Sequence, residues 1–306
     1  MNSPDGGEVE IRAAAGRRLI LTGVLVNILL AVAKFAGGVL GNSSALIADA
    51  IESALDIFSS GMMWAALKVA ARPPDASHPY GHGKVESLAA VAGALVLLGA
   101  GASLAAHSAG EILNSFSSPP TEASLPKAFT LGVLMLAILL KESLYRLFVH
   151  RGKAIDSAAL LADAWHRRSD AITSLAALIG ISIALAGGPS WAPADDWAAL
   201  FSCGIILFNG GRMLRGSLGE ILDEQMPDAL IDQVLDQVRS VEGVTSVEKC
   251  RVRKSGLTRI ADLHVRVAGG SSVREGHEVA HIVKNRLLAS GLNISDVTVH
   301  IEPERD

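Results

Sequence analysis

The chain has 306 residues and contains few cysteines, few aromatic residues and few charges. Cys203 lies in an apolar run and Cys250 in a polar region, which disfavours a disulfide between them. Because no Cys-x-x-Cys motif is present, metal chemistry here is expected to use nitrogen and oxygen ligands. The net charge of −4 is small and no basic run occurs, so the sequence indicates no nucleic-acid partner.

Charged residues make up only 19% of the chain and hydrophobic residues 50%, a balance typical of a protein embedded in a lipid bilayer. Crossing a bilayer takes about 20 apolar residues per helix. Runs of that length predict a bundle of six membrane helices, over residues 19–40, 45–71, 85–113, 127–149, 155–186 and 197–214. Arg72 and two following prolines end the second run, because proline disfavours helix at the residue before it.

The distribution of basic residues predicts the orientation of the bundle, since Lys and Arg concentrate in cytoplasmic loops. They flank the N-terminus, the second and fourth loops and the exit from the last run, at Arg12, Arg17, Arg18, Arg72, Lys84, Arg151, Lys153, Arg212 and Arg215. The opposite loops contain only Lys127. Both termini are therefore expected to be cytoplasmic.

From about residue 224 the composition becomes that of a soluble domain. Helical periodicity over 228–241 and 273–289, and strand alternation over 244–252, 258–267 and 296–302, predict a small α+β domain of order α-β-β-α-β. Within the second and third strands, His264 and His300 alternate with apolar residues. Both histidines are therefore expected on the polar face of a sheet.

Two of the apolar runs carry acids at helical spacing. Glu52 and Asp56 stand four residues apart in the second run, and His166 and Asp170 have the same spacing in the fifth. Side chains four apart lie one turn apart on one helix face, so each pair can reach one metal ion. Each ionisable group deep in a bilayer costs roughly 2.5–3.5 kcal/mol, which a bound cation or bound protons would offset. The alternative is that these acids cap helix ends or snorkel to the interface.

Asp49 and Asp163 each precede one of these pairs by three residues and share its helix face. With antiparallel helices, one acid is expected on the outer approach to the site and the other on the inner approach, as steps of an ion or proton path. Alternatively, each hydrogen-bonds a neighbouring helix.

With these paired ligands, the sequence resembles the cation diffusion facilitators, which are proton-coupled exporters of divalent metals. The resemblance implies a tail over 1–18, a transmembrane domain over 19–223 and a cytoplasmic domain over 224–306 that is metallochaperone-like and forms a homodimer. It also implies an integral membrane protein of the bacterial inner membrane, with metal ions and protons as partners, and no enzymatic cofactor. Glu52 departs from the family, which more often has Asp or His there, and this weakens an inference to zinc over iron, manganese, cobalt or cadmium.

The same resemblance implies further sites. In the second loop it implies a metal site at Asp75, His78 and His82; the alternative is a structural turn with solvated histidines. Lys84 corresponds to a family lysine that pairs with an acid after the sixth helix, here Asp223. In the cytoplasmic domain the positions implied to bind metal are Glu248, His264, His277, His300 and Glu302, and His281 is a substitute for His277 or simply exposed.

Two other functions stay open. One histidine with several acids also describes a membrane metalloenzyme, although no nucleophile stands at a fitting distance from a base. A membrane metal sensor that binds without transport is the second alternative, and it would need a sealed site. Acids on both approaches to the pairs favour transport, in which metal and protons compete for the same charges.

Overall fold

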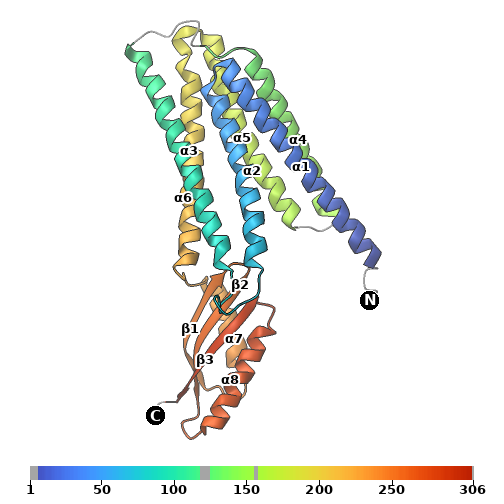
Figure 1. Ribbon diagram of the computed structural model, residues 1–306, viewed down its shortest axis with the longest axis vertical. Coiled ribbons are helices and arrows are strands. Elements are labelled where there is room, and N and C mark those ends of the chain that lie inside the picture. Colours follow the sequence, from blue (N-terminus) through green and yellow to red (C-terminus); the bar gives the residue numbers. More distant parts are fainter. Residues whose placement is uncertain (1–5, 118–124, 155–157, 305–306) are drawn as a thin grey trace. The chain divides into compact units, whose positions relative to one another are not determined.

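Six long helices are followed by two shorter helices and three strands, as Figure 1 shows. A computed structural model describes the backbone of residues 6–117, 125–154 and 158–304, and their side chains except at 6–22, 59–60, 63, 151–154 and 158–172. The long helices are α1 (Gly6–Gly41), α2 (Ser44–Ala70), α3 (Lys84–Ser117), α4 (Phe129–Ala154), α5 (Ala158–Gly187) and α6 (Pro193–Ile221). The short 3-10 helix η2 (Pro189–Trp191) precedes α6.

The helix ends differ most from the predicted ones at two places. α1 already begins at Gly6, whereas the apolar run begins at residue 19, and α6 extends to Ile221, seven residues past the predicted end. Hydropathy locates the apolar part of a helix, but a helix continues into polar sequence wherever no residue stops it. Pro193 starts α6 because proline is well accommodated at the first helical position.

The chain divides into two compact units, which are described separately below. The first, called the membrane unit, comprises Met1–Gly61 and Ala94–Gly211. The second, called the C-terminal unit, comprises Met62–Gly93 and Arg212–Asp306.

Small and branched apolar side chains form the core of the membrane unit. Its buried members come from α2 to α6 and are Ala45, Leu46, Ala48, Leu104, Leu134, Ala177, Ile181, Ala199 and Cys203. The small residues let helices approach closely, as at Gly180, where an added Cβ would overlap the side chain of Ala198. The tight packing fixes α5 against α6.

The structure contains six long helices, as the sequence predicts, but it does not confirm that all six cross a membrane. Within the described residues, three helices are long and apolar enough to cross a membrane: Gly23–Gly41, Lys84–Ser117 and Pro189–Ile221. α2 contains Asp49, Glu52 and Asp56, and the described apolar part of α5, Thr173–Gly187, is shorter. α4, which contains Lys141, Glu142 and Arg146, is likewise not among the three, so the apolar pattern is interrupted by charged residues in general and not by the predicted ligands alone.

A buried carboxylate from α6 caps the first turn of α2. Asp195 accepts hydrogen bonds from the Ser43 hydroxyl at 2.7 Å and from the backbone N–H of Ser44 at 2.6 Å. Ser43 also caps its own helix by accepting from the Leu46 N–H at 3.1 Å. The first N–H groups of a helix have no partner within it, and an anion there also complements the helix dipole. Asp195 therefore anchors the end of α2 that leads to the ligand pair.

The C-terminal unit contains the predicted α-β-β-α-β order: α7 (Asp228–Arg239), β1 (Ser246–Ser255), β2 (Thr258–Val267), α8 (Val273–Leu288) and β3 (Ile294–Pro303). The sheet has the order β1-β2-β3, with β1 antiparallel and β3 parallel to β2. Val234 and Val238 of α7 and Val283 and Leu287 of α8 pack on Leu263 and Val265 of β2. Both helices thus cover one face of the sheet. From Ala261 to Val267 the side chains of β2 alternate between buried and partly exposed, so the polar ones, His264 among them, lie on the other face.

Candidate metal sites

The acidic pair on α2, Glu52 and Asp56, is partly or largely shielded from solvent. Glu52 is 9% exposed, and Asp56, one turn later, is half-buried. A carboxylate withdrawn from solvent in this way requires a compensating charge or hydrogen bonds. Glu52 is thus largely withdrawn from solvent, and the assignment of this pair as metal ligands stays a prediction.

The second predicted pair lies on α5. The backbone of Asp163, His166 and Asp170 is helical, as expected, but their side chains lie outside the described residues. The coordination geometry of the four predicted ligands is therefore not part of the described structure, and the assignment remains a prediction.

A described contact nevertheless sets the register between the two helices. The Ser174 hydroxyl on α5 donates a hydrogen bond of 2.8 Å to Asp49 Oδ1 on α2. The two helices run in opposite directions (Figure 1). Each residue advances a helix by about 1.5 Å, so three or four steps along both helices lead from this contact to the level of Glu52 on α2 and Asp170 on α5. Four further steps lead to the level of Asp56 and His166.

Asp49 itself is held by a buried lysine. Lys34 Nζ of α1 lies 2.7 Å from Asp49 Oδ2, and both side chains are 0% exposed. Lys34 also donates to the hydroxyls of Ser53 and Ser174, each at 3.3 Å. The hydrogen bond from Ser174 matches the alternative given for Asp49, a bond to a neighbouring helix. The pairing with Lys34 was not predicted, although a lysine inside an apolar run signals that a counter-charge must lie on another helix.

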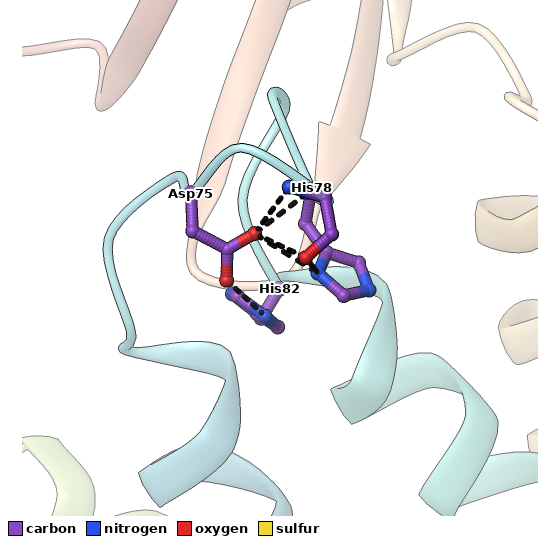
Figure 2. Close-up of polar contacts among 4 residues, drawn as sticks. Asp75, His78 and His82 are labelled. Carbon is purple, nitrogen blue, oxygen red and sulfur yellow. Dashed lines mark hydrogen bonds and ion pairs between the residues drawn. The ribbon is translucent and has the colours of Figure 1, made fainter.

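The loop between α2 and α3 brings Asp75, His78 and His82 together (Figure 2). Asp75 Oδ1 lies 3.2 Å from His78 Nδ1, and Asp75 Oδ2 lies 3.4 Å from His82 Nε2. The two imidazole rings are 4.4 Å apart between centroids. One ligand atom from each residue lies within 4.8 Å of the others, a spacing compatible with one metal ion.

Local hydrogen bonds shape this loop before any ion binds. Asp75 Oδ1 accepts from the Ser77 hydroxyl at 2.8 Å and from the backbone N–H of His78 at 2.7 Å. The bond from Ser77, followed by that from His78, holds the pKa of Asp75 well below its usual range, so the carboxylate stays ionised. His82 Nδ1 is buried and has no hydrogen-bond partner among the described residues. An acid, two imidazoles and an unsatisfied ring nitrogen fit a cation site.

The Gly-His-Gly-Lys end of the loop packs on the turn between β1 and β2. A Cβ at Gly83 would overlap the backbone of Ser255, and Gly256 has a positive φ of 61° against Gly83. Lys84 Nζ lies 2.8 Å from Asp223 Oδ1, which brings together the two residues that the sequence suggests as a pair. Sequence reasoning did not anticipate a neighbouring bridge, in which Lys254 Nζ lies 3.0 Å from Glu220 Oε2.

On the sheet, three of the five residues expected at the cytoplasmic site, His264, His300 and Glu302, form one group of possible ligands, and a fourth, Glu248, hydrogen-bonds Glu302. His264 and His300 are register partners on β2 and β3, and their ring centroids lie 4.9 Å apart. Glu302 Oε1 lies 2.8 Å from His264 Nδ1. Hydrogen bonding with Glu248, then with His264, lowers the pKa of Glu302 and keeps its carboxylate ionised. Glu248 also pairs with Arg266 at 3.1 Å.

The structure does not bring His277 to this group. His277 lies on α8, which covers the face of the sheet opposite His264, and its ring stacks edge-on against His281 at 4.5 Å between centroids. Sequence reasoning also missed that His277-Glu-Val-Ala-His281 matches the His-Glu-x-x-His pattern of zinc metalloproteases. Both histidines are exposed, and in the described chain no third ligand joins them in a metal-binding group.

Comparison with known proteins identifies the family. The family model of the cation efflux transmembrane domain matches residues 20–222 of the sequence, and the family model of the cytoplasmic domain of cation efflux proteins matches residues 226–304. The chain belongs to the cation efflux family, the cation diffusion facilitators. It is therefore a transporter of this family and not an enzyme, and the metalloenzyme alternative is wrong.

Relatives of the cation efflux family from plants and bacteria align along most of the chain. Cation-efflux pump FieF of Escherichia coli is 30% identical, covering 94% of this chain and 92% of its own. Manganese efflux system protein MneP of Bacillus subtilis is 26% identical, covering 95% and 97%. Metal tolerance protein C1 of Arabidopsis thaliana is 32% identical over 94% of this chain, which spans 62% of the length of that protein.

Proposed function

We propose that the protein exports a divalent transition-metal ion, of the zinc, iron, manganese, cobalt or cadmium class, in exchange for protons by alternating access. The transported ion binds Glu52 and Asp56 of α2 and His166 and Asp170 of α5. The main support is the hydrogen bond between Ser174 and Asp49, because its register sets the two ligand pairs at matching levels on facing helices. Oxygen-rich ligands with one imidazole suit several of these metals.

Competition for the same charges supplies the coupling. Four ionisable side chains at one depth in a bilayer require compensation in every state of the transport cycle. A divalent ion provides it in one state, and bound protons provide it after the ion has left. A site that faces alternate sides of the membrane then moves metal against protons, and a pH gradient drives efflux.

The proposal includes the arrangement in the membrane. α1 to α6 form six spans with both termini in the cytoplasm of a bacterial cell, and the domain matched by the cytoplasmic model forms the homodimer. The basic residues at the ends of the apolar runs support this orientation. Metal at the His264, His300 and Glu302 group is proposed to stabilise the dimer when the ion is abundant.

Flux into proteoliposomes tests the proposal. The native protein under an imposed pH gradient is expected to move at least one ion among manganese, iron, zinc, cobalt and cadmium, and Asp170→Ala is expected to reduce that flux to background. Asp232→Ala, which removes an exposed carboxylate of α7, is the matched control and should transport normally. Metal binding without flux in the native protein would contradict transport and leave a membrane metal sensor.

A further inference from the structure

A buried polar cluster joins three helices of the membrane unit near the proposed transport site. It consists of Lys34 on α1, Asp49 and Ser53 on α2, and Ser174 on α5, all of them buried. The Lys34–Asp49 ion pair measures 2.7 Å, and Ser174 bridges the two by accepting from Lys34 at 3.3 Å and donating to Asp49 at 2.8 Å. Lys141 of α4, also buried, lies beside Lys34.

The cluster lies next to the proposed ligands along both helices. Ser53 directly follows Glu52 in the chain, and Ser174 stands one turn after Asp170. A displacement of α2 along α5 would therefore have to break the contacts of Lys34 and Asp49 before it changed the level of the ligand pairs. In metal sites, the groups that orient the ligands without touching the ion commonly control affinity.

We propose that Lys34 and Asp49 are positioning residues for transport, which hold the ligand pair of α2 in register with that of α5 and do not themselves carry metal or protons. The inference rests on the proposed function. Asp49 has its charge compensated by the Lys34 ammonium and has a hydrogen bond from Ser174. A carboxylate paired in this way needs neither a metal ion nor a proton for compensation. This role differs from the ion or proton path that the sequence suggested for Asp49.

The test measures initial flux against metal concentration, together with the number of protons moved per ion, in proteoliposomes containing the full chain. The variants are Asp49→Asn, Lys34→Met and the double variant. A positioning role raises KM by roughly 10–100-fold and leaves the proton-to-metal ratio unchanged. Because both residues act through one contact, the double variant should show a change in KM close to that of the worse single variant.

Two results would overturn the inference. A lowered proton-to-metal ratio in Asp49→Asn, with KM unchanged, would make Asp49 a carrier of protons. Unaltered KM values in all three variants would show that the cluster does not position the ligands.

A milder variant covers the case in which Lys34→Met does not fold. Ser174→Ala removes only one hydroxyl and is expected to raise KM about fivefold without altering kcat. Ser182→Ala is its control on the same helix, because the Ser182 hydroxyl donates to the backbone carbonyl of Leu178, within α5, at 2.7 Å. Equal KM values in the two serine variants would contradict the role of the cluster.

Failure of the proposed transport function can be distinguished from failure of the positioning role. If the native protein shows no flux, equilibrium binding of Mn²⁺ is measured instead. Binding to the proposed site is the part of the Mn²⁺ binding that is lost in Asp170→Ala. Weaker binding to this site in Lys34→Met would then support the positioning role without transport, and unchanged binding would overturn it.

Discussion

Two Lys–Asp ion pairs in this chain have nearly the same length and opposite surroundings. Lys34 and Asp49 lie 2.7 Å apart in the membrane unit with both side chains 0% exposed. Lys284 and Asp296 lie 2.9 Å apart in the C-terminal unit, with side chains 39% and 47% exposed. Their geometry is almost equal, so any difference in their effect on the protein must come from the solvent around them.

The contrast shows what each pair does for its unit. Water solvates the exposed ions whether or not they meet, so such a pair contributes little to stability. The buried ions have no such alternative, and each one makes the other tolerable. A buried pair is thus poor evidence of net stabilisation, but separating α1 from α2 would leave each of the two ions without its counter-charge.

Breaking the buried pair is expected to give the largest effect. Lys34→Met leaves Asp49 as an uncompensated buried charge, which costs about 3–5 kcal/mol when one partner of a buried pair is removed. The double variant Lys34→Met/Asp49→Asn removes both charges and should recover most of that loss. Thermal unfolding of the full protein in detergent or nanodiscs measures both.

The same substitution at an exposed lysine of α2 is the control. Lys68 is exposed and lies over the Trp64 ring, with its Nζ 3.6 Å from the centroid, so Lys68→Met should change stability much less. Equal losses for Lys34→Met and Lys68→Met would show that burial of the pair has no energetic consequence.

The group of Asp75, His78 and His82 in the loop between α2 and α3 extends the comparison, because here the carboxylate faces two imidazoles and not a lysine. His82→Ala is expected to weaken binding of Zn²⁺ at the loop by at least about tenfold, since it removes the least exposed ligand of the group. Asp75 stays ionised because hydrogen bonds from Ser77 and His78 lower its pKa, so its carboxylate remains available as a ligand. Isothermal titration calorimetry measures the affinity.

The exposed His281 supplies the matched control for the loop. His281→Ala should leave the tight component of Zn²⁺ binding in place. If both variants bind Zn²⁺ as the native protein does, the loop is a structural turn with solvated histidines.

The sequence predicted the features that depend on neighbouring residues and missed those that depend on contacts between distant parts of the chain. Apolar run lengths and period-2 alternation predicted the long helices and the α-β-β-α-β order, because both depend on residues close together in the chain. The pairing of Lys34 with Asp49 and the cap that Asp195 forms on α2 join helices distant in sequence, and no local period encodes them. His277 was grouped with His264 through the family resemblance and not through a local pattern, and packing puts the two on opposite faces of the sheet.

The exposed pair is expected to give the smallest effect, with a definite dependence on pH. The hydrogen bond from Lys284 lowers the pKa of Asp296, so its stabilisation is present in full above the ordinary pKa of about 4 and is lost as the pH falls through the lowered value. Lys284→Met should therefore cost less than about 1 kcal/mol at pH 7 and nothing measurable in strong acid. Hydrogen exchange of the β3 amides in the full chain, compared at each pH with the exposed-lysine control Lys249→Met, measures it. A loss as large as that of Lys34→Met would mean that the length of an ion pair, and not its burial, sets the cost of breaking it.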